Sequence, residues 1–247
     1  MKRLIQTLAA AFLLVAWNPT GNKQDGKEVT PVVFFEDDFG IKSQGEYVSN
    51  IIHLPPPQGL GYTWKVLEGG HKPVKWIHSD ELKPDDPKKG FWVIPADSGY
   101  LAQGGRSHNS VLFANAPIPP EINEYRITFR QKRGDNDPIM FILGAQAPVY
   151  DSGYETGYMI QVPGTDSTTN NAFVLGALGE HMVADAAFAH EWAHHRIDVQ
   201  GKQVKWTCNN ILMADGTIDG LQPGYFGIRH RYERNTYYDD FKIILVK

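Results

Sequence analysis

The side chains best suited to chemistry in this sequence are cationic, amide and phenolic groups rather than acids. They lie on or beside predicted strands: Arg106, His108, Asn109, Tyr158, Gln161, His195, Arg229, His230, Arg231 and Tyr237. A histidine or tyrosine can remove a proton next to a carboxylate, while arginine, glutamine, asparagine or histidine stabilises the charge that grows there. The acid and base candidates are therefore His108, His230, Tyr158 and Tyr237. The other six residues of this set are candidate substrate contacts.

Strand parity and charge support a shared groove for this set. Arg106 and His108 share one strand face, as do Arg229 and Arg231, because alternate residues of a strand point the same way. The stretch from Arg229 to Tyr238 is locally basic in a chain of net charge −4, which suits an anionic ligand. The alternative interpretation is that these residues form the solvated faces of ordinary strands.

The acidic residues do not form the pair that glycoside hydrolysis usually needs. Most of them lie in predicted loops or turns, among them Glu121, Glu155, Glu180, Asp215 and Asp219. This placement disfavours a two-carboxylate hydrolase. It stays an alternative, since loops can carry catalytic groups.

Residues 190–194 spell HExxH, the pattern of zinc proteases. That chemistry needs a helix, so that both histidines project from one face. Here the pattern leads into a predicted hairpin, and no third ligand follows at the expected spacing. We interpret the match as coincidence. The alanine-rich residues 182–194 predict one short helix or a loop.

Two acidic clusters suggest a metal site. Residues 36–38 are Glu-Asp-Asp beside the first predicted strand, and residues 239–240 are Asp-Asp before the last one. If those strands are neighbours, Asp38 and Asp240 are candidate ligands for a structural Ca²⁺, which prefers oxygen. The alternative is that they are turn residues, with one carboxylate capping backbone N–H groups. We expect the chemistry itself to need no cofactor.

The elements that must position these residues are short strands. From residue 31 onward, apolar or alternating runs are separated by turn signals, which predicts an all-β sandwich or barrel. The predicted strands cover residues 32–35, 91–94, 110–114, 124–132, 138–144, 157–162, 172–175, 195–200, 203–208, 224–230 and 240–246. Gly201 and Lys202 form the predicted turn of a hairpin. The single cysteine, Cys208, excludes an internal disulfide and is predicted to be a buried, inert thiol.

A long loop region precedes most of these strands. Residues 53–90 are rich in proline, glycine and lysine, which predicts surface loops. Trp64, Trp76 and Trp92, among residues 60–95, are either a platform for sugar stacking or loop packing. We expect packing for at least two of them.

The N-terminus predicts export. Lys2 and Arg3 precede a nearly uncharged stretch to Trp17, which is shorter than the ~20 apolar residues of a membrane span. We predict a signal peptide over 1–20, a flexible leader over 21–30 and a single domain over 31–247. The alternative to the signal is a buried N-terminal helix. The chain has no basic face suited to nucleic acid and no second apolar span.

Three segments carry a resemblance to a known superfamily. Residues 124–130 read EYRITFR, residues 191–201 read EWAHHRIDVQG, and GYFGI at 224–228 leads to YDDFKI at 238–243. Together they resemble the concanavalin A-like lectin/glucanase superfamily, nearest the bacterial 3-keto-disaccharide hydrolase-type and jelly-roll polysaccharide lyase families. The resemblance implies a two-sheet antiparallel jelly-roll β-sandwich. The chain lacks the opening segment of the keto-disaccharide family and the strand-borne carboxylate triad of the family's glucanase relatives.

Together with the residues, the resemblance implies a carbohydrate-active enzyme that is periplasmic, on the cell surface or secreted from a bacterium. The leading hypothesis is a polysaccharide lyase that cleaves a uronic-acid-containing glycan by β-elimination. One alternative is a glycoside hydrolase of the 3-keto-disaccharide type. Another is a non-catalytic carbohydrate-binding module. The expected partner is a polysaccharide or oligosaccharide, and the sequence does not set the oligomeric state.

Overall fold

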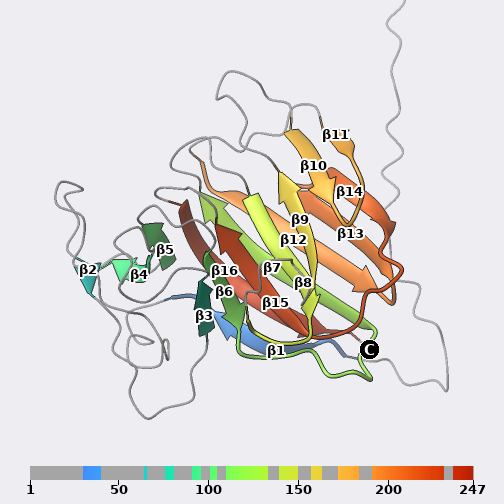
Figure 1. Ribbon diagram of the computed structural model, residues 1–247, viewed down its shortest axis with the longest axis horizontal. Coiled ribbons are helices and arrows are strands. Elements are labelled where there is room, and N and C mark those ends of the chain that lie inside the picture. The colour runs from blue at the N-terminus through green and yellow to red at the C-terminus, as the bar shows by residue number, and fades with distance from the viewer. Residues whose placement is uncertain are drawn as a thin grey trace, which may run out of the picture. The chain divides into compact units, whose positions relative to one another are not determined.

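The computed structural model describes residues 30–39, 64–65, 76–80, 91–95, 101–104, 110–132, 139–149, 157–162, 172–183, 191–230 and 236–246 (Figure 1). Residues 31–247 form one compact unit. The predicted signal peptide and nearly all of the leader lie outside the described residues and stay predictions. The described residues contain no helix, and so none that could cross a membrane.

One antiparallel sheet has nine strands. Its order is β14 (Ile211–Thr217), β13 (Gln203–Cys208), β12 (Ala193–Gln200), β7 (Glu124–Lys132), β16 (Thr236–Leu245), β5 (Leu101–Gly104), β4 (Phe91–Pro95) and β2 (Trp64–Lys65). Its ninth strand, β1 (Val32–Asp37), also pairs with β16.

The second antiparallel sheet has seven strands. Its order is β11 (His181–Val183), β10 (Ala172–Gly176), β9 (Tyr158–Val162), β8 (Ile139–Ala145), β15 (Tyr225–His230), β6 (Ser110–Ala114) and β3 (Trp76–Asp80). The chain passes between the sheets repeatedly, for example from β6 to β7 and from β14 through β15 to β16. The predicted two-sheet antiparallel jelly-roll sandwich is thus confirmed, and Figure 1 shows its two layers of strands.

The core lies between the sheets because each strand buries every second residue. On β7, Tyr125, Ile127 and Phe129 are buried while their neighbours are partly exposed. From the facing sheet, Phe141 and Phe226 reach Phe129 with ring centroids 6.4 and 6.1 Å away. The predicted alternation of residues 125–130 is therefore the alternation of core and surface.

Two further sequence predictions fall in this core. Cys208 is a buried free thiol, and burial raises its pKa to about 12, so it is inert as predicted. Trp76 is fully buried and its ring packs edge-on to Phe35 at 5.3 Å, so it is a packing residue. The side chains of Trp64 and Trp92 lie outside the described residues.

The first and last strands of the described residues are neighbours, the condition of the Ca²⁺ hypothesis: β1 pairs with β16 from Val32 opposite Leu245 to Asp37 opposite Phe241. Asp37, at the end of β1, is buried. Its Oδ1 accepts a hydrogen bond from the Phe39 N–H at 2.9 Å, and its Oδ2 accepts one from the Trp76 indole at 2.8 Å. Because Trp76 belongs to the other sheet, this carboxylate links the two layers.

Backbone irregularities shape one end of the nine-stranded sheet. The turn between β13 and β14 has Asn209 and Asn210 at positive φ, the geometry of a tight hairpin turn. Strand β16 shifts register between Asp239 and Lys242, and Asp240 at this bulge has a φ of 49°. Such a bulge re-aims the side chains around it. Both irregularities border the site described next.

Candidate functional site

Two of the predicted substrate contacts share the outer face of the seven-stranded sheet. Phe226 and Ile228 point into the core, so Arg229 points to the opposite face. Arg229 is opposite Met140 on β8, and Met140 is opposite Gln161 on β9. The Arg229 side chain is only 1% exposed, and its Nη1 lies 2.7 Å from the Met159 sulfur. Arg229 and Gln161 therefore lie in one cross-strand row, on a largely buried face.

Two other predicted residues point into the core instead. Tyr158 packs against the core cluster beside Gly220. His195 is 2% exposed, stacks on Phe129 at 4.8 Å, and its Nδ1 accepts a hydrogen bond from the Trp206 indole at 3.2 Å. His195 has the same parity as the core residue Ile197, so its side chain is not available to a ligand.

The remaining candidates are Arg106, His108, Asn109, Arg231, His230 and Tyr237. Arg106, His108, Asn109 and Arg231 lie outside the described residues. His230 ends β15 opposite Ser110, and its side chain lies outside them as well. Tyr237 lies on β16, opposite Lys132 of β7. Its neighbour Tyr238 points into the core, so Tyr237 belongs to the outer face of the nine-stranded sheet.

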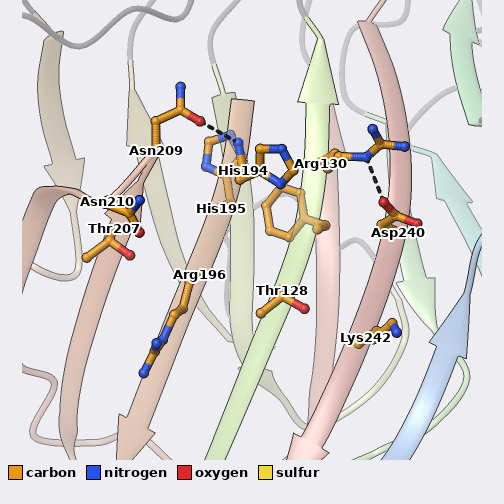
Figure 2. Close-up of a pocket in the computed structure, with 11 residues that line it drawn as sticks. Thr128, Arg130, His194, His195, Arg196, Thr207, Asn209, Asn210, Asp240 and Lys242 are labelled. Carbon is orange, nitrogen blue, oxygen red and sulfur yellow. Dashed lines mark hydrogen bonds and ion pairs between the residues drawn. The ribbon is translucent and has the colours of Figure 1, made fainter. Parts of the chain in front are cut away.

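That outer face contains a hollow of about 690 Å³, within the usual range of ligand pockets (Figure 2). It lies where β12, β7, β16 and the β13–β14 turn meet. The lining residues are Thr128, Phe129, Arg130, His194, His195, Arg196, Thr207, Asn209, Asn210, Asp240 and Lys242. Phe129 and His195 have inward-facing side chains, so their backbone forms part of the floor.

The hollow follows from the residue types of two cross-strand rows. In one row, Thr207, Arg196, Thr128 and Lys242 lie opposite one another across β13, β12, β7 and β16. In the next row, His194 is opposite Arg130, and Arg130 is opposite Asp239. The short threonines leave space between the long arginine and lysine side chains, which form the walls.

Arg130 is held from several sides. Its Nη2 donates to Asp239 Oδ2 in a short ion pair, and its Nε lies 2.8 Å from Asp240 Oδ2, the pair marked in Figure 2. Its guanidinium carbon lies 5.1 Å from the centre of the Trp192 ring, a cation–π contact. Burial raises the pKa of Asp239, while the Asp240 N–H and Arg130 act in the opposite direction. The Arg130 head is thus fixed in place.

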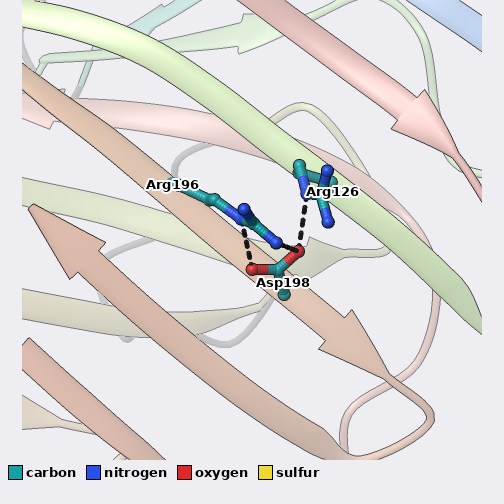
Figure 3. A network of polar contacts seen from close by, with 3 residues as sticks. All are labelled: Arg126, Arg196 and Asp198. Atoms are coloured by element: carbon teal, nitrogen blue, oxygen red, sulfur yellow. Dashed lines mark hydrogen bonds and ion pairs between the residues drawn. The ribbon is translucent and has the colours of Figure 1, made fainter. Parts of the chain in front are cut away.

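Arg196 is fixed by a second network, which it forms with Arg126 and Asp198 (Figure 3). Asp198 Oδ2 accepts from Arg196 Nε at 2.6 Å, and Asp198 Oδ1 accepts from Arg196 Nη2 at 3.1 Å and from Arg126 Nε at 2.6 Å. One carboxylate is therefore shared by two guanidinium groups. The network carries a net charge of +1.

The amide side chains complete the rim at the hairpin turn. Asn209 Oδ1 accepts a hydrogen bond from the His194 backbone N–H at 2.8 Å, which ties the turn to the start of β12. Asn209 and Asn210 are both exposed. The hollow therefore offers fixed donors and acceptors, which a ligand rich in hydroxyl groups needs.

The sequence raised two metal hypotheses, a Ca²⁺ site at Asp38 and Asp240 and the zinc pattern HExxH. Pairing of Asp37 with Phe241 places Asp38 beside Asp240 by register, but Asp240 already faces Arg130. Among the described residues, no group of three or more histidine, cysteine or acidic side chains could hold a metal ion. The Ca²⁺ site stays a prediction.

In the HExxH match, Glu191 lies in a bend and His194 on a strand, so the helix that zinc proteases need is absent from residues 191–194.

The sequence interpretation missed most of the residues that line this hollow. Arg130, His194, Arg196, Lys242, Asn209 and Asn210 were not among its candidates. The signal was present in the clean alternation of residues 125–130 and 195–199, because the residues between the core positions must share the outer face. Of the candidates, Asp240 and His195 line the hollow, and the His195 side chain packs into the core.

No family model and no curated protein matches the sequence. Several solved structures are similar. A carbohydrate-binding module from Bacillus subtilis is 11% identical with a TM-score of 0.48, over 68% of this chain and 94% of that one. A galectin-like protein of unknown function from Bacillus subtilis is 13% identical with a TM-score of 0.49, over 70% and 90%. An alginate lyase is 8% identical with a TM-score of 0.44, over 62% and 78%.

These likenesses concern the fold and do not extend to function at such identities. The two antiparallel sheets confirm the jelly-roll sandwich that the resemblance implied.

Proposed function

We propose that this is a carbohydrate-active protein that binds an acidic glycan in the hollow on its nine-stranded sheet. The observation that carries the proposal is the composition of the hollow. Its lining side chains include three cations, Arg130, Arg196 and Lys242, against one carboxylate, Asp240. Two exposed amides, Asn209 and Asn210, and two half-buried hydroxyls, Thr128 and Thr207, also line it.

The pre-set geometry of the polar groups favours a carbohydrate over a simple anion. A sugar presents hydroxyls that both donate and accept, so its site needs both kinds of partner in fixed positions. Arg130 with Asp240 supplies a donor beside an acceptor, and Asn209 and Asn210 each supply both. Trp192 braces Arg130 from one side, so this arginine loses little side-chain freedom when a ligand binds.

The finer proposal is β-elimination at a uronic acid. A base removes the proton at C5, the bond from C4 to the bridging oxygen breaks, a C4–C5 double bond forms, and an acid protonates the leaving oxygen. A cationic side chain neutralises the carboxylate as charge grows on it. His108, His230 and Tyr237 stay the predicted acid and base groups. His194 joins them, because it is exposed in the hollow opposite Arg130.

Hydrolysis by two carboxylates is the less favoured chemistry. Asp239 and Asp240 are adjacent in the chain, and both contact Arg130. They do not face each other across a space that could hold a glycosidic bond, as an acid and a nucleophile must. Two of the similar solved structures are a carbohydrate-binding module and an alginate lyase. The proposal nevertheless rests on the hollow alone.

The test is titration calorimetry with tetramers of glucuronate, galacturonate and mannuronate, and with neutral tetramers. Thr128→Phe fills the floor of the hollow and should abolish binding. Thr217→Phe, the same change at an exposed position of β14 outside the hollow, should leave binding unchanged. Binding by no acidic tetramer, or equal binding by both variants, would overturn the proposal.

The same mixtures distinguish an enzyme from a binder. A lyase creates a conjugated double bond, so ultraviolet absorbance rises with one acidic glycan, and His194→Ala should slow the rise. New reducing ends without this absorbance indicate a hydrolase, which contradicts the finer proposal. Saturable binding without either product indicates a binding module and also contradicts it.

A further inference from the structure

The hollow is divided into two halves by the two cross-strand rows described above. The row of His194, Arg130 and Asp239, with Asp240 at its end, is called here the upper row. The row of Thr207, Arg196, Thr128 and Lys242 is called the lower row. They are two residues apart along β12 and β7, and three along β16 because of its bulge, so their separation is ~7 Å. A single sugar unit can therefore touch both rows.

The upper row has no surplus positive charge. Arg130 is contacted by both Asp239 and Asp240, and one guanidinium with two carboxylates sums to −1. The Asp240 side chain is 53% exposed and lines the hollow, so its carboxylate can accept a hydrogen bond from a ligand. A ligand carboxylate placed here meets net negative charge, whereas a hydroxyl finds a donor and an acceptor side by side.

The lower row has the surplus. Arg196 belongs to the network of charge +1 with Arg126 and Asp198. Lys242 adds another positive charge. Its Nζ lies 3.9 Å from Glu36 Oε2, but both side chains are about half exposed or more, so water weakens the attraction. Thr128 lies between Arg196 and Lys242 with a short hydroxyl side chain.

We propose, on the basis of the function proposed above, that the hollow binds an acidic sugar in one orientation. The sugar carboxylate then lies on the lower row at Lys242, and the ring hydroxyls lie on the upper row at Arg130 and Asp240. Lys242 then selects for the acid, and Asp240 opposes binding in the reversed orientation. Preference for an acid over its neutral ester is therefore set by two residues of one strand, Asp240 in the β16 bulge and Lys242 just after it.

The test compares acidic tetramers of glucuronate, galacturonate and mannuronate with their methyl esters, which keep the hydroxyls but lose the charge. Lys242→Gln should weaken binding of the acid about tenfold and change binding of the ester little, because a hydrogen bond to a charged partner is lost only with the acid. Asp240→Asn should raise the ratio of acid to ester affinity. Asparagine is chosen because it tolerates the positive φ of this position.

Each outcome decides something. If the wild-type protein binds neither acid nor ester, the proposed function fails and this inference with it. If the wild type binds but both variants change acid and ester affinity by the same factor, only the two-row orientation is overturned. Thermal unfolding of each variant checks the fold, and Lys242→Met provides a second uncharged replacement should Lys242→Gln unfold.

Discussion

Replacing Asp37 by alanine should loosen the contact between the two sheets near β1. The carboxylate is 3% exposed and accepts from the Phe39 N–H at 2.9 Å and from the Trp76 indole at 2.8 Å. Hydrogen bonds to a charged partner contribute ~1.5–3 kcal/mol each, and both donors are left buried without this acceptor. The expected loss is about 3–5 kcal/mol of unfolding free energy.

The measurement is equilibrium unfolding in urea, followed by tryptophan fluorescence, together with thermal scans. For a chain of this size, each kcal/mol lowers the melting temperature by ~2–4 °C, so a fall of about 10 °C is expected. Asp37→Asn keeps one acceptor oxygen and should lose about half as much stability.

The matched control is Glu36→Gln, which removes a carboxylate one residue earlier on the same strand. Glu36 is 65% exposed and its partner Lys242 is 3.9 Å away, so the change should cost under ~0.5 kcal/mol. If Asp37→Ala unfolds at the same urea concentration as this control, the carboxylate does not link the sheets and the reasoning is wrong.

Three further predictions concern the core and the turns. Cys208, whose pKa burial raises to about 12, should react with a thiol reagent at neutral pH only after urea unfolds the chain; rapid labelling of the native protein contradicts this. Burial also raises the pKa of Tyr125, so the unfolded chain loses this proton first and stability falls as pH rises above ~10. Tyr125→Phe should flatten that alkaline fall in urea unfolding, and an unchanged slope contradicts it. Gly176 has a φ of 101°, and Gly176→Ala drives a methyl group into the Met159 carbonyl, which should cost ~3 kcal/mol or more of unfolding free energy in thermal unfolding. Gly201 has a φ of 58° and open space around it, so Gly201→Ala should cost ~1 kcal/mol. Equal losses contradict the steric argument.

The sequence predicted the fold well because the sandwich repeats one simple rule. Alternation over residues 125–130 and 195–199 placed Ile127, Phe129 and Ile197 in the core, and a β-sheet buries one side-chain parity. The pairing of β1 with β16 was only a condition of the Ca²⁺ hypothesis, because alternation within each strand does not show which strands pair. Pairing partners far apart in the chain leave no local signal.

The site was harder to predict because chemistry depends on which strands become neighbours. Arg130, Arg196 and Lys242 are far apart in sequence, and only the order β12–β7–β16 makes them one wall. The prediction for His195 overlooked its parity with Ile197, which turns it toward Trp206. Asp240 was considered as a metal ligand, and the bulge that turns it toward Arg130 has no sequence signature.

Strand β16 follows every other strand in the chain and yet occupies an interior place in the nine-stranded sheet. It pairs with β7 on one side and with β5 and β1 on the other. During synthesis, the edges of β1, β5 and β7 that pair with β16 therefore stay unpaired until residues 236–245 have been made. A chain cut before Thr236 loses the seam that joins both halves of the sheet, together with the Asp240 and Lys242 wall of the hollow. Completion of the fold and completion of the site are thus the same late event.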